Sequence, residues 1–107
     1  MPRRPPPDEV CAALADPTRW RVLTLLAAHG DGTATTLAAA LPVSRPAVVK
    51  HLVVLDRAGL VRAHRRGREV RYTVRPEQLD ATARWMASVA AEWDARLAAI
   101  KRIAEGE

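Results

Sequence analysis

The sequence predicts a mainly α-helical fold with one small β-hairpin, and three observations support this prediction. Up to Gly59, apolar residues recur every three or four positions, which is the spacing of helices. Between Leu60 and Val74 the spacing falls to two, which is the spacing of strands. From Pro76 to Ala104 the helical spacing returns and continues without a break. A chain of 107 residues has the length of a single domain.

The N-terminal part predicts a tail followed by two helices. Residues 1–7 contain four prolines and are expected to form a disordered tail. A short helix is predicted from about Asp8 to Ala15. Asp16 and Pro17 then begin a second helix that ends near His29, because aspartate caps free amides and proline fits the first turn. The apolar face predicted for this second helix consists of Trp20, Leu23 and Ala27, beside Val22 and Leu26.

Two further helices are predicted on either side of a tight turn. The first spans Thr33 to Ala40 and is stopped by Pro42. Ser44 caps the second, Pro46 lies in its first turn, and Gly59 ends it. The buried face of this second helix consists of Val48, Leu52 and Leu55. Helix, tight turn and helix make a helix-turn-helix motif.

The strand-like segment predicts a basic hairpin. Its strands are Leu60 to Arg65 and Arg68 to Val74, with Gly67 in the turn. Along the second strand, Val70, Tyr72 and Val74 are expected to point inward, and Glu69, Arg71 and Thr73 outward. The tip, Arg65-Arg66-Gly67-Arg68, contains no acidic residue. A helix-turn-helix followed by such a hairpin is a winged helix-turn-helix, in which a helix fits the DNA major groove and the hairpin reaches the flanking backbone or minor groove.

The last third of the chain predicts one long helix with a heptad seam. The seam residues are Leu79, Ala83, Met86, Ala90, Trp93, Leu97, Ile100 and Ala104. At about 1.5 Å per residue the length of this helix exceeds roughly 40 Å, so one small domain cannot bury the whole apolar seam. We therefore predict a homodimer formed by the first and last helices. Its expected interface residues are Val10, Cys11, Leu14, Met86, Ala90, Trp93, Leu97 and Ile100. The chain thus divides into a tail (1–7), a winged helix-turn-helix (8–75) and a dimerisation helix (76–107) of the same domain.

Charge is concentrated in the middle of the chain. The net charge is +5, but arginine-rich coding alone can produce such a total. Residues 1–42 are neutral, residues 43–75 carry +7 and residues 76–107 carry −2. The cationic segment coincides with the second helix of the motif and the hairpin, which indicates double-stranded DNA as the partner.

The residues expected to contact DNA lie on the outward face of that helix and on the hairpin tip. They are Ser44, Arg45, Pro46, Val49, Lys50, His51, Arg65, Arg66 and Arg68. Arg45, Lys50 and Val49 are assigned to base readout, and Ser44 with the three tip arginines to phosphates or the minor groove. Val49 and Val53 are apolar, so they either meet DNA or pack under the hairpin. The alternative function is a protein-interaction or assembly module that uses a groove formed by these two valines.

Three stretches resemble the ArsR-type (arsenic-repressor-like) winged helix regulators: ALADPTRWRVLTLL (13–26), VSRPAVVKHLVVLDRAGLV (43–61) and GREVRY (67–72). The resemblance implies a homodimeric repressor of a pseudo-palindromic operator, with dimerisation through the first and last helices. Many such proteins sense metal through a Cys-x-Cys pair, at whose positions this chain has Thr33 and Thr35. Residues 76–107 also lack the histidine that other members use. The resemblance is therefore to the branch that does not sense metal, which carries a Trp-Asp-x-Arg-Leu pattern like Trp93 to Leu97.

Other functions find little support in the sequence. No nucleophile, base and acid occur at catalytic spacing and no phosphate-binding glycine loop is present, so we expect neither an enzyme nor a cofactor. No apolar run reaches the roughly 20 residues of a membrane span and no leader is recognisable, which indicates a cytoplasmic protein. Cys11 is either a redox sensor or, as we favour, a small buried hydrophobe. Trp85 and Trp93 either line a pocket for an unknown inducer or, as we favour, belong to the core.

Overall fold

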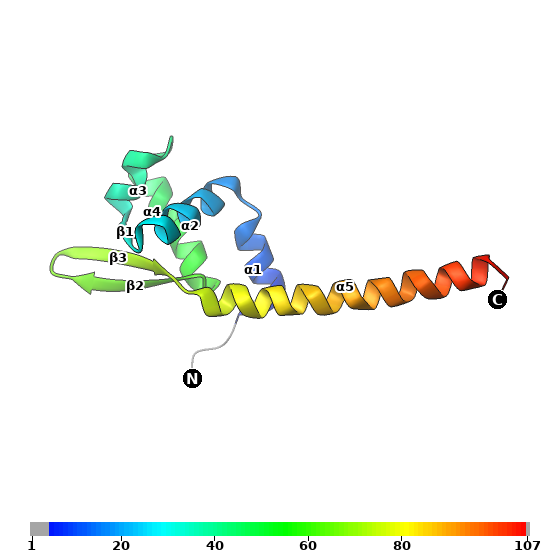
Figure 1. Cartoon of the computed structure of the whole chain (residues 1–107). Helices are drawn as coiled ribbons and strands as arrows, with labels where there is room; N and C mark the ends of the chain where they lie inside the picture. Colours follow the sequence, from blue (N-terminus) through cyan, green and yellow to red (C-terminus); the bar gives the residue numbers. More distant parts are fainter. Residues whose placement is uncertain (1–4, 107) are drawn as a thin grey trace.

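The computed structural model describes residues 5–106, which form five helices and a three-stranded sheet (Figure 1). The helices are α1 (Pro7–Leu14), α2 (Pro17–His29), α3 (Ala34–Ala40), α4 (Arg45–Arg57) and α5 (Pro76–Ala104). The strands are β1 (Gly32–Thr33), β2 (Val61–Arg66) and β3 (Glu69–Val74). The predicted fold class, mainly helical with a winged helix-turn-helix arrangement, is confirmed.

Local capping signals determine where the helices begin and end. The Asp16 carboxylate accepts a hydrogen bond from the Arg19 amide at 2.9 Å, and the Ser44 hydroxyl accepts one from the Ala47 amide at 3.3 Å. Gly59 follows α4 with a φ of +75°, a conformation that glycine adopts without strain. The predicted starts of α2 and α4 are therefore confirmed.

The predicted disordered tail is wrong in its last residues. Residues 1–4 of that segment lie outside the described residues. Pro7 is the first residue of α1, where proline is tolerated because first-turn amides need no helical acceptor. Pro5 packs beside Gly59, where an added Cβ would come within 3.4 Å of its Cγ.

A single apolar core is shared by the helices α1, α2, α3 and α4 and by the base of the hairpin. Its largest fully buried side chains are Val10, Val22, Leu26, Val48, Leu52, Leu55, Leu60 and Val61. Trp20 is 56% exposed and Ala27 is exposed as well, so the predicted apolar face of α2 is wrong at these two positions. The helical period of α2 allows several faces to be buried, and its contacts with α4 and β3 select the one that carries Val22 and Leu26.

The sheet has the strand order β1-β3-β2 and is antiparallel throughout. Strand β1 was not predicted, because two residues carry no alternation pattern. It pairs Thr33 with Arg71 and so attaches the hairpin, or wing, to the start of α3. Near the tip the wing extends beyond the core, and Val70, predicted to point inward, is exposed (Figure 1).

Helix α5 projects from the rest of the protein as a single rod (Figure 1). Its first turns pack against α1, and Thr82 is buried there. The radius of gyration is 18.5 Å, against about 13 Å for a compact chain of this length. Within residues 5–106 no single helix is long and apolar enough to cross a membrane, and only the pair α3 and α4, bent by 115°, meets the length and composition together.

Candidate nucleic-acid interface

Helix α4 presents a basic face to solvent while its opposite face lies in the core. Val48, Leu52 and Leu55 are fully buried, which fixes the rotation of the helix about its axis. The N-terminal residues Ser44, Arg45 and Pro46 and the following Lys50 are exposed as a result. The free amides of the first turn add to the positive potential at this end of α4.

A groove of about 600 Å³ separates α4 from the wing. Its lining comes from the start of α3, from α4 and from β3: Thr33, Ala34, Thr35, Thr36, Arg45, Val49, Arg68, Glu69, Val70 and Tyr72. The Nε of Arg45 donates a hydrogen bond to the Thr35 hydroxyl at 3.2 Å, so this side chain is held at the groove edge. The sequence does not predict this contact of Thr35, because its partner lies ten residues away. The groove places Arg45 and Arg68 around one space.

The two apolar residues of the α4 face have different environments. Val49 is half-buried, packs against the core and lines the groove opposite the wing. Val53 is 43% exposed and lies outside the groove lining. Val49 thus faces the space between α4 and the wing, whereas Val53 does not, and the two valines do not form a common groove.

His51 points away from the exposed basic face. Its Nδ1 lies 3.9 Å from the Asp16 carboxylate, and its side chain is 20% exposed. The Arg19 backbone amide, with a smaller contribution from His51, lowers the pKa of Asp16 below its usual value. His51 thus joins α4 to the start of α2 and stays partly exposed, so its predicted DNA contact remains a prediction.

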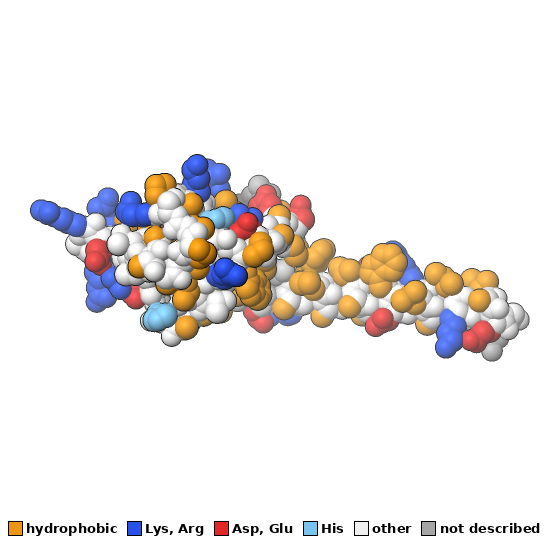
Figure 2. All heavy atoms as spheres, turned by 90° about the horizontal axis from the view of Figure 1, so that it is seen from above, with side chains coloured by type: hydrophobic (Ala, Val, Ile, Leu, Met, Phe, Trp, Pro, Cys, Tyr) orange, Lys and Arg blue, Asp and Glu red, His pale blue; other side chains and the backbone are white. Residues whose placement is uncertain are grey.

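The wing carries three exposed arginines at its tip: Arg65, Arg66 and Arg68. Gly67 has a φ of +64° and makes the two-residue turn between β2 and β3 possible. None of the three guanidinium groups forms an ion pair with a carboxylate of the described residues. Figure 2 shows Lys and Arg side chains gathered at this end of the molecule.

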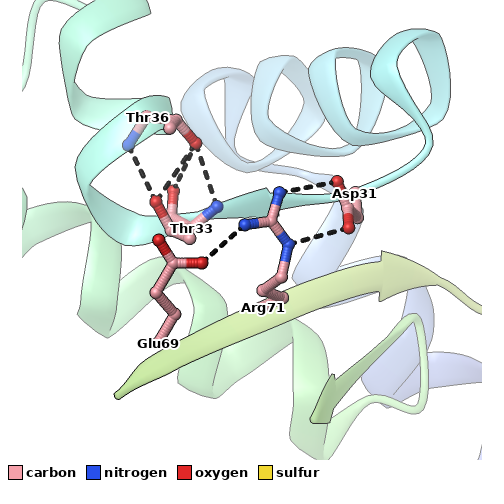
Figure 3. A network of polar contacts seen from close by, with 5 residues as sticks. All are labelled: Asp31, Thr33, Thr36, Glu69 and Arg71. Atoms are coloured by element: carbon pink, nitrogen blue, oxygen red, sulfur yellow. Dashed lines mark hydrogen bonds and ion pairs between the residues drawn. The ribbon is translucent and has the colours of Figure 1, made fainter. Parts of the chain in front are cut away.

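Arg71 differs from the tip arginines because it is engaged in ion pairs. It donates to both oxygens of Asp31, at 2.8 and 3.0 Å, and to Glu69 at 2.7 Å (Figure 3). The guanidinium lowers the pKa of Asp31, and the two carboxylates raise the pKa of Arg71. The prediction that Arg71 points outward is wrong, because β1 brings Asp31 against β3. No sequence signal connects two residues that lie 40 positions apart.

A second candidate surface is the apolar stripe of α5. Met86, Trp93, Leu97 and Ile100 are each more than half exposed, and Ile103 is 74% exposed. Figure 2 shows hydrophobic side chains along the projecting helix. A contiguous apolar surface of this kind is uncommon on a monomer and marks an interaction site. Arg96 stacks over the Trp93 ring at 5.4 Å and keeps its charge at the edge of the stripe.

The residues predicted for this surface on α1 do not all lie on it. Val10 is fully buried in the core of its own chain, so it has no surface to contribute and that prediction is wrong. Cys11 and Leu14 are half-buried. Ala90, on the stripe of α5, is exposed.

The threonines at the positions of the Cys-x-Cys pair have structural contacts. Thr33 and Thr36 form a reciprocal capping box at the start of α3, with the Thr36 amide donating to the Thr33 hydroxyl at 3.1 Å. Thr35 holds Arg45, as described above. Within residues 5–106, no three His, Cys, Asp or Glu side chains gather as metal ligands would.

Comparison with known proteins gives matches over most of the chain. Residues 14–64 match the model of a helix-turn-helix domain family. The chain is 34% identical over 79 residues to the transcriptional repressor SdpR of Bacillus subtilis, covering 74% of this chain and 87% of SdpR. It is 49% identical, with a TM-score of 0.80, to the structure of an ArsR-like transcriptional regulator from Rhodococcus sp. RHA1, covering 91% of each chain. A homodimeric winged helix-turn-helix DNA-binding domain from Mycobacterium bovis, a possible ArsR-family regulator, matches with a TM-score of 0.63 and 28% identity, covering 79% of this chain and 77% of that one.

Proposed function

Because this chain belongs to the ArsR-type family of winged helix-turn-helix transcriptional regulators, we propose that it is a homodimeric repressor of a pseudo-palindromic operator. One observation carries the proposal: α4 and the wing place Arg45 and Arg68 around one groove, and neither is ion-paired with a carboxylate of the described residues. Two such units in a dimer reach successive major grooves about one helical turn apart.

Base readout is assigned to the N-terminal part of α4. Arg45 and Lys50 are exposed and long enough to reach guanine edges, and Ser44 with the first-turn amides is placed to bind a phosphate. Pro46 is exposed beside them and is assigned to packing against the DNA. Val49 has less side-chain surface available for a base contact than Arg45 or Lys50, because it is half-buried against the core.

The wing arginines are assigned to phosphates or the minor groove. Arg65, Arg66 and Arg68 extend from the tip with no carboxylate of the described residues within ion-pair distance. Such contacts strengthen binding to any sequence and make it depend on salt.

The dimer is assigned to α5 and the surface of α1. The homodimeric relative supports this assignment, as does the apolar stripe that one chain leaves exposed. Its proposed residues are Cys11, Leu14, Met86, Ala90, Trp93, Leu97 and Ile100.

The test is fluorescence anisotropy with duplexes that tile the region upstream of the protein's own gene, measured over a range of salt concentrations. We expect one duplex to bind at least 100-fold more tightly than a scrambled one. Arg66→Ala weakens both and reduces the salt slope by about two, one phosphate contact per protomer. Arg45→Ala reduces the preference for the specific duplex, and Arg102→Ala on α5 is the control. If no duplex binds at low salt, the protein is instead an interaction or assembly module.

A further inference from the structure

Arg71 lies where the wing meets the helix-turn-helix. Its guanidinium bonds both oxygens of Asp31, which precedes β1, and one oxygen of Glu69, at the start of β3 (Figure 3). Its side chain is 24% exposed, against 57% for Glu69. A planar guanidinium bonds one carboxylate through two parallel donors and a second through a third, a fork that an ammonium group lacks.

The same region is also joined through the backbone. Thr33 pairs with Arg71 in the β1–β3 ladder, and Thr33 is the N-cap of α3. Helix α3 in turn packs against α4. The Asp31–Arg71 pair therefore lies on one of the connections between the wing and α4, beside the direct packing of β2 on α4.

Arg71 also controls the charge of the groove. Glu69 is the acidic residue among the groove lining, beside Arg45 and Arg68. An unpaired carboxylate at this point would repel a DNA phosphate and attract the neighbouring arginines. Arg71 is bonded to Glu69 at 2.7 Å and offsets part of this charge, since the same guanidinium is also paired with Asp31.

We propose that Arg71 is a positioning residue for DNA binding, which fixes the wing against the helix-turn-helix and offsets part of the Glu69 charge without itself contacting DNA. The inference rests on the proposed function for its DNA readout. It assigns Arg71 to a class distinct from the tip arginines, although all four belong to the same cationic segment.

The decisive measurement is a double-mutant cycle on the specific duplex. Arg71→Met is expected to weaken binding at least 10-fold, and Arg71→Met with Glu69→Gln to recover at least 3-fold of that loss. Glu69→Gln alone is expected to change binding less than 2-fold, because Arg71 is already bonded to this carboxylate. Arg71→Lys keeps the charge but loses the fork, and is expected to weaken binding by a factor between those of the wild type and Arg71→Met. Arg62→Met, on the neighbouring strand β2, is the matched control.

Direct phosphate contact gives a different pattern. In that case Arg71→Lys binds like the wild type, or Glu69→Gln improves binding by the same factor with and without Arg71, and either result overturns the proposal.

Hydrogen exchange without DNA gives an independent readout. Arg71→Met and Arg71→Lys are expected to accelerate amide exchange in residues 61–74, with little change in residues 45–57. Unchanged exchange in the wing overturns the positioning role. If the wild type binds no duplex, the proposed function fails, and the exchange data alone decide whether Arg71 fixes the wing.

Discussion

Truncation of Leu97 tests the proposed dimer most directly. Leu97 is 57% exposed in the single chain. Full burial of a leucine is worth roughly 1.5–3 kcal/mol, so covering the exposed part contributes about 0.9–1.7 kcal/mol per side chain. A two-fold interface contains two copies, and alanine retains one methyl group. Leu97→Ala is therefore expected to weaken dimerisation by about 1.3–2.5 kcal/mol, or roughly 10- to 60-fold in Kd.

Sedimentation equilibrium over a concentration series measures this Kd. Arg102→Ala is the control, because Arg102 is exposed and lies about 140° around the helix from Leu97. Its Kd is expected to stay within about 2-fold of the wild type, since no interface is assigned to that side. A wild type that remains monomeric at micromolar concentration, or equal effects of the two substitutions, would refute the assignment of the stripe.

Three further predictions concern stability. Leu52→Ala, at a fully buried position, is expected to lower the free energy of unfolding by about 2–5 kcal/mol in urea titrations, whereas Val53→Ala next to it costs less than about 1 kcal/mol. Ser44→Ala removes the cap of α4 and is expected to cost about 1 kcal/mol in the same assay; a loss near zero would mean that the 3.3 Å bond contributes nothing. Arg71 lowers the pKa of Asp31 from its usual 3.8, so the stabilisation is present above that pH and is lost as pH falls through the lowered pKa. The difference in Tm between the wild type and Asp31→Asn is therefore expected to shrink below about pH 4, and Asp56→Asn, which removes no ion pair of the described residues, serves as control.

The helix boundaries were predictable because their causes are local. An aspartate or serine before a proline determines a helix start within four residues, as at Asp16 and Ser44. The change of period after Gly59 likewise located the hairpin to within a residue at each strand end. These signals act over a few positions, so one sequence is enough to interpret them.

The environment of individual side chains was less predictable because distant contacts decide it. A helical stripe identifies which residues share a face but not which partner covers it, and so Val10 was assigned to an interface although it lies in the core. Likewise, no sequence signal places Asp16 beside His51, which lies 35 positions later. The contact between Thr35 and Arg45 at the candidate site is another such case, since it depends on how α3 meets α4.

Ion pairs change what the cationic segment means for function. Residues 43–75 carry a net charge of +7, but Arg71 is paired with two carboxylates, one of them Asp31 from outside the segment. The charge available to a phosphate backbone is therefore smaller than the sequence total, and it is concentrated at the tip of the wing and the start of α4. The salt dependence of binding counts phosphate contacts rather than formal charges. Its slope is therefore expected to follow the number of these exposed residues and not the net charge of the segment.

The backbone hydrogen bond from Arg75 to Leu60, 2.8 Å long, joins the end of β3 to the base of β2 directly before α5 begins. The base of the wing and the start of α5 are therefore held together by the chain and by this hydrogen bond.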